Sequence, residues 1–191
     1  MRPILSALAL SLVSAPAGAE DPGSTAPRVE LLTNHGALVL ELDPAKAPAT
    51  TANFLRYVRD GHYDGLIFHR VIPGFMAQAG GYDADFKERD TREPVENESR
   101  NGLSNERGTI AMARTNNPHS ATAQFFINLV DNPRLDGGPG SWGYTVFGRL
   151  VEGLDVLDKI AAIPTGRGGP FPTDVPQAPV VINSARVVEA D

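Results

Sequence analysis

FHRVIPGFMAQ, which occupies residues 68–78, is an apolar run with a Pro-Gly pair near its centre. Pro73-Gly74 favours a tight bend, so the run predicts two short strands around that bend rather than one helix. His69, Arg70 and Gln78 interrupt the apolar residues at positions that a strand buried on one face would not give to polar side chains. We therefore expect Arg70 and Gln78 to face a cleft.

Strand-like runs lie on both sides of this segment. Residues 28–42 predict a hairpin, because RVELLTN and ALVLEL enclose a turn at Asn34-His35-Gly36. Further strands are expected at Thr109–Ala113, Gln124–Val130, Tyr144–Val151 and Val180–Val188. Strands this numerous usually avoid exposed edges by closing into a barrel.

Two short helices are expected between the strands. The first begins near Pro48, where Thr50 and Thr51 can cap it, and it ends at Asp60-Gly61. The second is predicted at Leu154–Ala162, where apolar residues gather on one side.

Two long segments show no apolar periodicity. Tyr82–Asn101 is charged and irregular, which predicts a surface loop whose carboxylates are solvated. Pro164–Pro179 is rich in Gly and Pro and is interpreted as a connection.

Composition excludes several kinds of chemistry. The chain has 191 residues, 41% of them hydrophobic, which allows one domain of ordinary size with a packed core. The absence of cysteine excludes thiol catalysis, cysteine-bound zinc, iron–sulfur clusters and disulfides. A net charge of −6 argues against a nucleic-acid partner, and the four histidines show no metal-binding spacing.

The first residues have the layout of a secretory signal peptide. A positive charge at Arg2 precedes an apolar run too short to span a bilayer, and Ala17-Gly18-Ala19 supplies a cleavage pattern. We therefore predict a signal peptide at residues 1–19, a flexible leader at 20–27 and one folded domain at 28–190. The product would be exported, with no membrane span after cleavage. A buried N-terminal helix is the alternative interpretation.

Several blocks, in order along the chain, resemble the cyclophilin-type peptidyl-prolyl cis–trans isomerases. They are FHRVIPGFMAQAGG at 68–81, GTIAMAR at 108–114, SATAQFFI at 120–127, then Leu135-Asp136 and Val146-Phe147-Gly148. The resemblance spans roughly residues 28–188 and is closest in style to exported, periplasmic bacterial members. It implies a mainly β fold, a closed eight-stranded antiparallel barrel capped by two short α-helices.

The resemblance also implies a role for individual residues. It makes Arg70 the catalytic residue, whose guanidinium stabilises the twisted prolyl amide. It places the substrate against His69, Phe75, Met76, Gln78, Ala113, Arg114, Thr115, Gln124, Phe126, Leu135 and Tyr144. Rotation about a prolyl bond makes no new bond, so no cofactor and no metal are expected. The expected partners are proline-containing polypeptides, and the chain is expected to act as a monomer.

Some positions depart from the family pattern. Arg134 stands where many members carry a tryptophan that matters for cyclosporin binding, which predicts weak affinity for that drug. Tyr144 replaces a frequent histidine and Arg114 a frequent asparagine. Trp142, in a Gly-rich loop, either folds over the pocket rim or is a partly exposed loop aromatic.

Two other functions remain open from the sequence. The chain could hold exported polypeptides as a chaperone, with incidental isomerase activity, in which case Arg70 and the aromatic residues grip peptide. A lipocalin-like carrier of small molecules is the other alternative. The polar strand that carries Arg70 argues against it, because a carrier cavity is lined from many strands.

Overall fold

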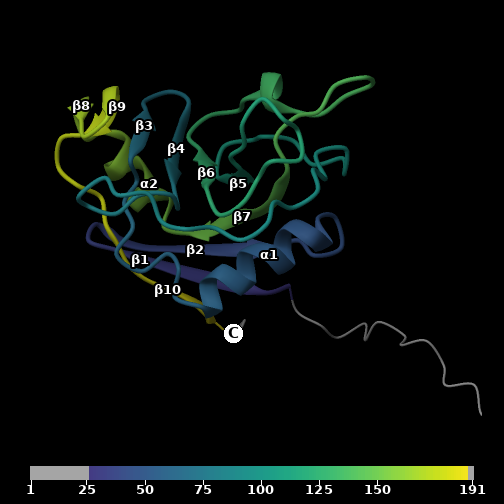
Figure 1. Cartoon of the computed structure of the whole chain (residues 1–191), viewed down its shortest axis with the longest axis horizontal. Helices are drawn as coiled ribbons and strands as arrows, with labels where there is room; N and C mark the ends of the chain where they lie inside the picture. The colour runs from purple at the N-terminus through teal and green to yellow at the C-terminus, as the bar shows by residue number, and fades with distance from the viewer. Residues whose placement is uncertain (1–25, 189–191) are drawn as a thin grey trace, which may run out of the picture.

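The computed structural model describes residues 26–188, and its main sheet contains eight antiparallel strands in the order β10-β1-β2-β7-β5-β6-β4-β3 (Figure 1). The elements in chain order are β1 Arg28–Thr33, β2 Gly36–Leu42, α1 Pro48–Arg59, β3 Arg70–Ile72, β4 Met76–Ala79, β5 Thr109–Met112, β6 Phe125–Asn128, the short 3-10 helix η1 Pro133–Leu135, β7 Val146–Glu152, α2 Leu154–Ala161, β8 Thr165–Gly168, β9 Phe171–Pro176 and β10 Ile182–Val188. The predicted hairpin at 28–42, the two strands around Pro73-Gly74 and the two helices are confirmed.

The prediction of a closed barrel was wrong, because the sheet is curled but open. Within residues 26–188 no strand ladder joins the two terminal strands, β3 and β10. The segments around the start of these two strands are joined by one isolated bridge, between Ile67 and Val181. Single hydrogen bonds there, such as Phe68 N–H to the Val180 carbonyl at 2.9 Å, satisfy part of the edge without continuing the sheet.

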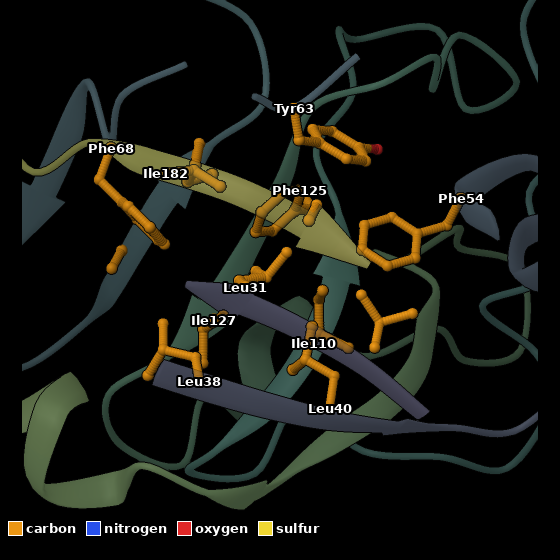
Figure 2. Close-up of a cluster of buried hydrophobic side chains, with 14 of the residues drawn as sticks. Leu31, Leu38, Leu40, Phe54, Tyr63, Phe68, Ile110, Phe125, Ile127 and Ile182 are labelled. Carbon is orange, nitrogen blue, oxygen red and sulfur yellow. The ribbon is translucent and has the colours of Figure 1, made fainter. Parts of the chain in front are cut away.

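Alternation along the strands separates two buried clusters. On β6, Phe125 and Ile127 point into the main core, whereas Phe126 belongs to a smaller cluster on the other face. Figure 2 shows the main core, in which the Phe125 ring meets Phe54 of α1 edge-on at 5.6 Å between ring centroids. α1 packs against β10, and α2 packs against β2.

The prediction that Thr50 and Thr51 cap α1 was wrong. A residue of a distant loop caps its N-terminus instead. Thr50 and Thr51 lie inside the helix and are buried. The Glu98 carboxylate accepts hydrogen bonds from the N–H groups of Ala49 and Thr50, at 3.0 and 2.8 Å. A carboxylate at this end satisfies free N–H groups and interacts favourably with the helix dipole.

The loop at 82–101 is therefore only partly a solvated surface. Its irregular course is as predicted, but Asn97 and Ser99 are buried. The Asn97 amide donates hydrogen bonds to the carbonyls of Pro118 and Gly143, which ties the loop to two other connections. The prediction failed for Glu98 and Asn97 because their partners lie far away in the sequence.

The Gly/Pro-rich segment at 164–179 contains a second, two-stranded sheet, β8 with β9, that the sequence did not predict. Pro172 and Pro176 lie within β9, which is tolerated because a two-stranded ribbon needs only half of each strand's N–H groups. β9 packs against β3, the strand that begins with Arg70 (Figure 1).

The predicted signal peptide at 1–19 lies outside the described residues, as do positions 20–25 of the predicted leader and residues 189–190 of the predicted domain. No helix within residues 26–188 combines the length and the apolar character that crossing a membrane requires.

Candidate functional site

Three side chains from neighbouring strands form a row across one face of the sheet. Arg70 of β3 stands opposite Gln78 of β4, and Gln78 stands opposite Phe126 of β6. Phe126 in turn pairs with Ala111 of β5. Because neighbouring strands lie about 4.8 Å apart, this register sets a cation, an amide and an aromatic ring side by side.

The turn between β3 and β4 fixes the next two residues. Gly74 has a φ of +72°, a conformation that side-chain-bearing residues rarely adopt, so glycine suits this turn. The Phe75 N–H donates to the Ile72 carbonyl at 3.0 Å and closes the turn. Met76 then starts β4 two positions before Gln78, so both side chains lie on the same face.

These residues surround a pocket of about 460 Å³. It is lined by eleven of the twelve residues that the sequence suggested, namely His69, Arg70, Phe75, Met76, Gln78, Ala113, Arg114, Gln124, Phe126, Leu135 and Tyr144, and also by Tyr82 and Phe171. Thr115 does not line it. The structure therefore brings together residues that lie as far apart in the chain as His69 and Phe171.

One end of the pocket is apolar. Met76, Ala111, Phe126 and Val146 form a buried cluster of their own, against which Phe75, Leu135 and Tyr144 pack. The rings of Phe126 and Tyr144 meet edge-on with 5.6 Å between centroids. This end offers a fixed apolar surface for a small ring.

The other end is polar. The Gln78 amide nitrogen donates to the side-chain oxygen of Gln124 at 2.9 Å, so one oxygen and one amide group of this pair stay free. The Arg70 guanidinium is half-exposed, and its Nε lies 3.7 Å from a carboxylate oxygen of Asp174 in β9. The pocket thus offers a cation and amide groups beside the apolar surface.

His69 is the buried titratable group of this site. The residue is only 2% exposed, and its ring packs against those of Tyr82 and Phe171. Burial lowers the pKa of His69 to about 4, from an ordinary value of 6.5, and the positive charge of Arg70 acts in the same direction. His69 is therefore neutral at physiological pH and presents an uncharged ring to the pocket.

The lowered pKa of His69 predicts a loss of stability in mild acid. The unfolded chain takes up this proton near pH 6.5, whereas the folded protein does so only near pH 4, so the free energy of unfolding falls as pH drops through that window. The difference amounts to about 3 kcal/mol. We expect His69→Phe, which keeps an aromatic ring, to lack this part of the slope in denaturant titrations between pH 7 and pH 4. Equal slopes for both proteins would contradict the prediction.

Arg114 lines the pocket and is held there by an aromatic ring and by backbone carbonyls. Its guanidinium lies 4.6 Å above the Tyr144 ring and donates to the carbonyls of Gly143, Thr115 and Trp142. Thr115 itself is exposed, and its N–H donates to the Ser120 hydroxyl at 3.0 Å. A substrate contact of Thr115 stays a prediction.

Trp142 does not line the pocket. Its ring meets His119 at 5.0 Å between centroids, and the Arg100 guanidinium lies 4.0 Å from the Trp142 ring centroid. Of the two interpretations of this residue, the loop aromatic is therefore the one that the structure favours over the pocket rim.

Sequence reasoning missed the contribution of Tyr82, Phe171 and Asp174. The Tyr82 and Phe171 rings meet edge-on at 5.1 Å between centroids, beside His69. The glycines of the GG pair before Tyr82 were a usable signal of close approach, since a Cβ on Gly81 would collide with the Gln124 side chain. No comparable signal marked Phe171 in its Gly/Pro-rich segment.

The chain is similar to known proteins over most of its length. The family model described as cyclophilin type peptidyl-prolyl cis-trans isomerase/CLD matches residues 28–187. Peptidyl-prolyl cis-trans isomerase cyp18 of Streptomyces antibioticus is 55% identical over 163 residues, which cover 84% of this chain and 98% of that protein. Peptidyl-prolyl cis-trans isomerase B of Escherichia coli K12 is 54% identical over 160 residues, covering 82% of this chain and 97% of the relative.

A solved structure shows the same architecture. A cyclophilin type peptidyl-prolyl cis-trans isomerase of Cryptosporidium parvum, crystallised in the presence of the dipeptide Ala-Pro, aligns with a TM-score of 0.70 at 26% identity. The alignment covers 86% of this chain and 99% of that one. With the family model, the close relatives and the fold in agreement, the chain belongs to the cyclophilin family of enzymes, the peptidyl-prolyl cis–trans isomerases.

Proposed function

We propose that the pocket binds a prolyl residue of a polypeptide and that Arg70 stabilises the twisted amide as the X-Pro bond rotates. One observation carries the proposal: the row Arg70, Gln78 and Phe126 sets a cation beside an apolar surface in a single pocket. Rotation must overcome a barrier of about 18–20 kcal/mol, because it breaks amide resonance. The pocket therefore acts by stabilising a geometry, not by supplying a nucleophile.

The apolar end is the proposed site of the proline ring. Phe126 and Met76 are buried, and Phe75 and Leu135 pack on their cluster, so these side chains already stand in place before a substrate arrives. A ring bound there replaces water and holds the prolyl side of the bond fixed. The Cryptosporidium parvum relative was crystallised in the presence of the dipeptide Ala-Pro, which supports a proline-containing peptide as the ligand.

Arg70 is the proposed donor to the prolyl nitrogen. That nitrogen gains a localised lone pair only when resonance is lost, so a hydrogen bond from the guanidinium favours the twisted state over both planar isomers. A charge-assisted hydrogen bond contributes about 1.5–3 kcal/mol. The rest of the acceleration would come from the preorganised pocket around it.

The amide pair is proposed to hold the peptide backbone. Since Gln78 donates to Gln124, the free oxygen of Gln78 and the free NH2 of Gln124 can accept from and donate to a peptide main chain. The backbone of Ala113 and Arg114 would contact the segment that precedes the proline; Ala113 is held beside Gln124, because its N–H donates to the Gln124 carbonyl at 2.9 Å. These contacts position the substrate and do not enter the chemical step.

We also propose that the protein acts on exported polypeptides in the periplasm. The proposal rests on residues 1–19, where Arg2, an apolar run and Ala17-Gly18-Ala19 occur in the order typical of signal peptides. Mass spectrometry of the protein from its native cells is expected to show Glu20 as the first residue, and a mature protein that retains residues 1–19 would contradict it.

Catalysis of peptide isomerisation tests the proposed function. We expect the purified protein to accelerate cis–trans exchange of a short X-Pro peptide, followed by NMR exchange spectroscopy, at one enzyme per hundred peptides. Uncatalysed exchange takes tens to hundreds of seconds, which gives a clear baseline. A chaperone that merely holds peptide would change exchange only near equimolar amounts, and that result would contradict the proposal.

A further inference from the structure

A carboxylate from the unpredicted strand β9 lies beside the proposed catalytic residue. Asp174 Oδ2 is 3.7 Å from Arg70 Nε, and no other carboxylate within residues 26–188 pairs with Arg70. The side chains of Arg70 and Asp174 are 43% and 32% exposed, so the pair lies at the pocket edge and is not buried in the core. The β9 strand that carries Asp174 also contributes Phe171 to the pocket wall.

The contact with Asp174 leaves the two terminal nitrogens of the Arg70 guanidinium free. A guanidinium carries donors on Nε and on two terminal nitrogens. Asp174 faces Nε, so both terminal nitrogens remain available to a substrate in the pocket. At 3.7 Å the contact is an ion pair rather than a hydrogen bond, which means that Asp174 acts on Arg70 through charge.

The backbone at Asp174 is held in an uncommon conformation. Its φ is +69°, and within residues 26–188 only Phe86 among the other non-glycine residues has a positive φ. Asp and Asn tolerate this region better than most residues, and such conformations persist where the surroundings determine them. Here the surroundings are the short β8–β9 ribbon, with Val175 buried next to Asp174.

We propose that Asp174 is a positioning residue, which holds the Arg70 guanidinium at the pocket edge with its terminal nitrogens directed to the substrate. The inference rests on the proposed role of Arg70. Because both partners are partly exposed, the expected effect is small: loss of the charge should lower kcat/KM two- to fivefold, equivalent to about 0.4–1 kcal/mol. The loss should fall on kcat, since Asp174 does not line the pocket and would act only through Arg70, the residue proposed to stabilise the twisted amide.

Asp174→Asn is the sharpest variant. Asparagine keeps the shape of the side chain and tolerates a positive φ, so the β8–β9 ribbon should be retained while the charge is lost. Asp174→Gly, which accepts this φ without strain, should reproduce the loss. Asp155→Asn is the matched control, because it removes an equal charge from an exposed pair with Lys159 on α2, outside the pocket. That control should keep wild-type kcat/KM.

Salt and a double-mutant cycle separate positioning from a structural role. Raising ionic strength to about 1 M should lower the rate of the wild type towards that of Asp174→Asn and leave that variant unchanged, since salt screens exposed pairs. In an Arg70→Ala background, Asp174→Asn should have no further effect. An equal loss in both backgrounds, or wild-type kcat in Asp174→Asn, would overturn the inference.

The Arg70 and Asp174 variants together test the two proposed roles separately. If Arg70→Ala retains wild-type kcat/KM, the proposed role of Arg70 fails, and the role of Asp174 fails with it. If Arg70→Ala loses activity while Asp174→Asn and Asp174→Gly retain it, only the positioning role fails. Circular dichroism and denaturant titration of each variant check that every rate refers to folded protein.

Discussion

Arg70→Ala is expected to lower kcat/KM for X-Pro isomerisation by on the order of a hundredfold. The reason is the lost charge-assisted hydrogen bond, whose contribution of about 1.5–3 kcal/mol converts at about 1.36 kcal/mol per tenfold in rate. Arg70 is partly exposed and is the first residue of β3. Removal of its side chain should therefore leave the core unchanged. The free energy of unfolding should change by less than about 1 kcal/mol.

Arg70→Lys is the matched variant for this prediction. Lysine keeps the positive charge but lacks the planar fork of donors, so an intermediate loss is expected if hydrogen-bond geometry matters as well as charge. Rates are measured by NMR exchange spectroscopy on a single X-Pro peptide for all three proteins. Near-normal activity of a folded Arg70→Ala protein would refute the assignment of Arg70.

Phe125→Ala is expected to lower the free energy of unfolding by about 3–5 kcal/mol, the usual range for deleting a buried phenylalanine. Phe125 is fully buried, and its ring contacts those of Phe54, Tyr63 and Phe68 at centroid distances of 5.6, 5.4 and 6.3 Å. Figure 2 shows three of these rings, Phe54, Tyr63 and Phe125, close together in the core. Denaturant titration measures the loss, and a change below about 1 kcal/mol would contradict this description of the core.

Phe126→Ala is the matched control one position away. Phe126 points to the other face of β6, into the smaller buried cluster that it forms with Met76, Ala111 and Val146, and it lines the pocket. We expect Phe126→Ala to lower kcat/KM at least tenfold, because it removes part of the apolar surface proposed to bind the proline ring. Its free energy of unfolding should fall less than that of Phe125→Ala. Folded Phe125→Ala, measured at low temperature, should keep most of its activity. The reverse pattern would mean that the two faces of β6 have been assigned wrongly.

Much of the fold could be predicted because its strands carry local signals. The hairpin at 28–42 alternates apolar and polar residues around a glycine turn, and Pro73-Gly74 marks the bend between β3 and β4. The β8–β9 ribbon was missed, since its prolines and glycines oppose a strand interpretation. The open edge was missed because closure depends on whether Ile67 and Val181 extend into ladders, which no local pattern reports.

The site likewise contains residues that local sequence patterns predict and residues that they do not. Arg70, Met76 and Gln78 lie within one contiguous block: alternation along β4 places Met76 and Gln78 on one face, and the hairpin register sets Arg70 opposite Gln78. Gln124 and Phe126 lie two positions apart in a second block. Phe171 and Asp174 reach the site only because β9 packs against β3, about a hundred residues earlier in the chain. The Glu98 cap of α1 is equally non-local. Such contacts arise from tertiary packing, which residue patterns alone do not encode.

Binding of the peptide and rotation of its prolyl bond can be measured separately in the Arg70→Ala variant. Two quantities are measured for one X-Pro peptide: its Kd by NMR titration, and the cis–trans exchange rate of the enzyme-bound peptide at saturation. If Arg70 stabilises the twisted amide, the Kd should change only a few-fold while the bound exchange rate falls on the order of a hundredfold. If instead the Kd rises a hundredfold and bound exchange keeps its wild-type rate, Arg70 only binds the peptide, and the proposed role of Arg70 in catalysis is wrong.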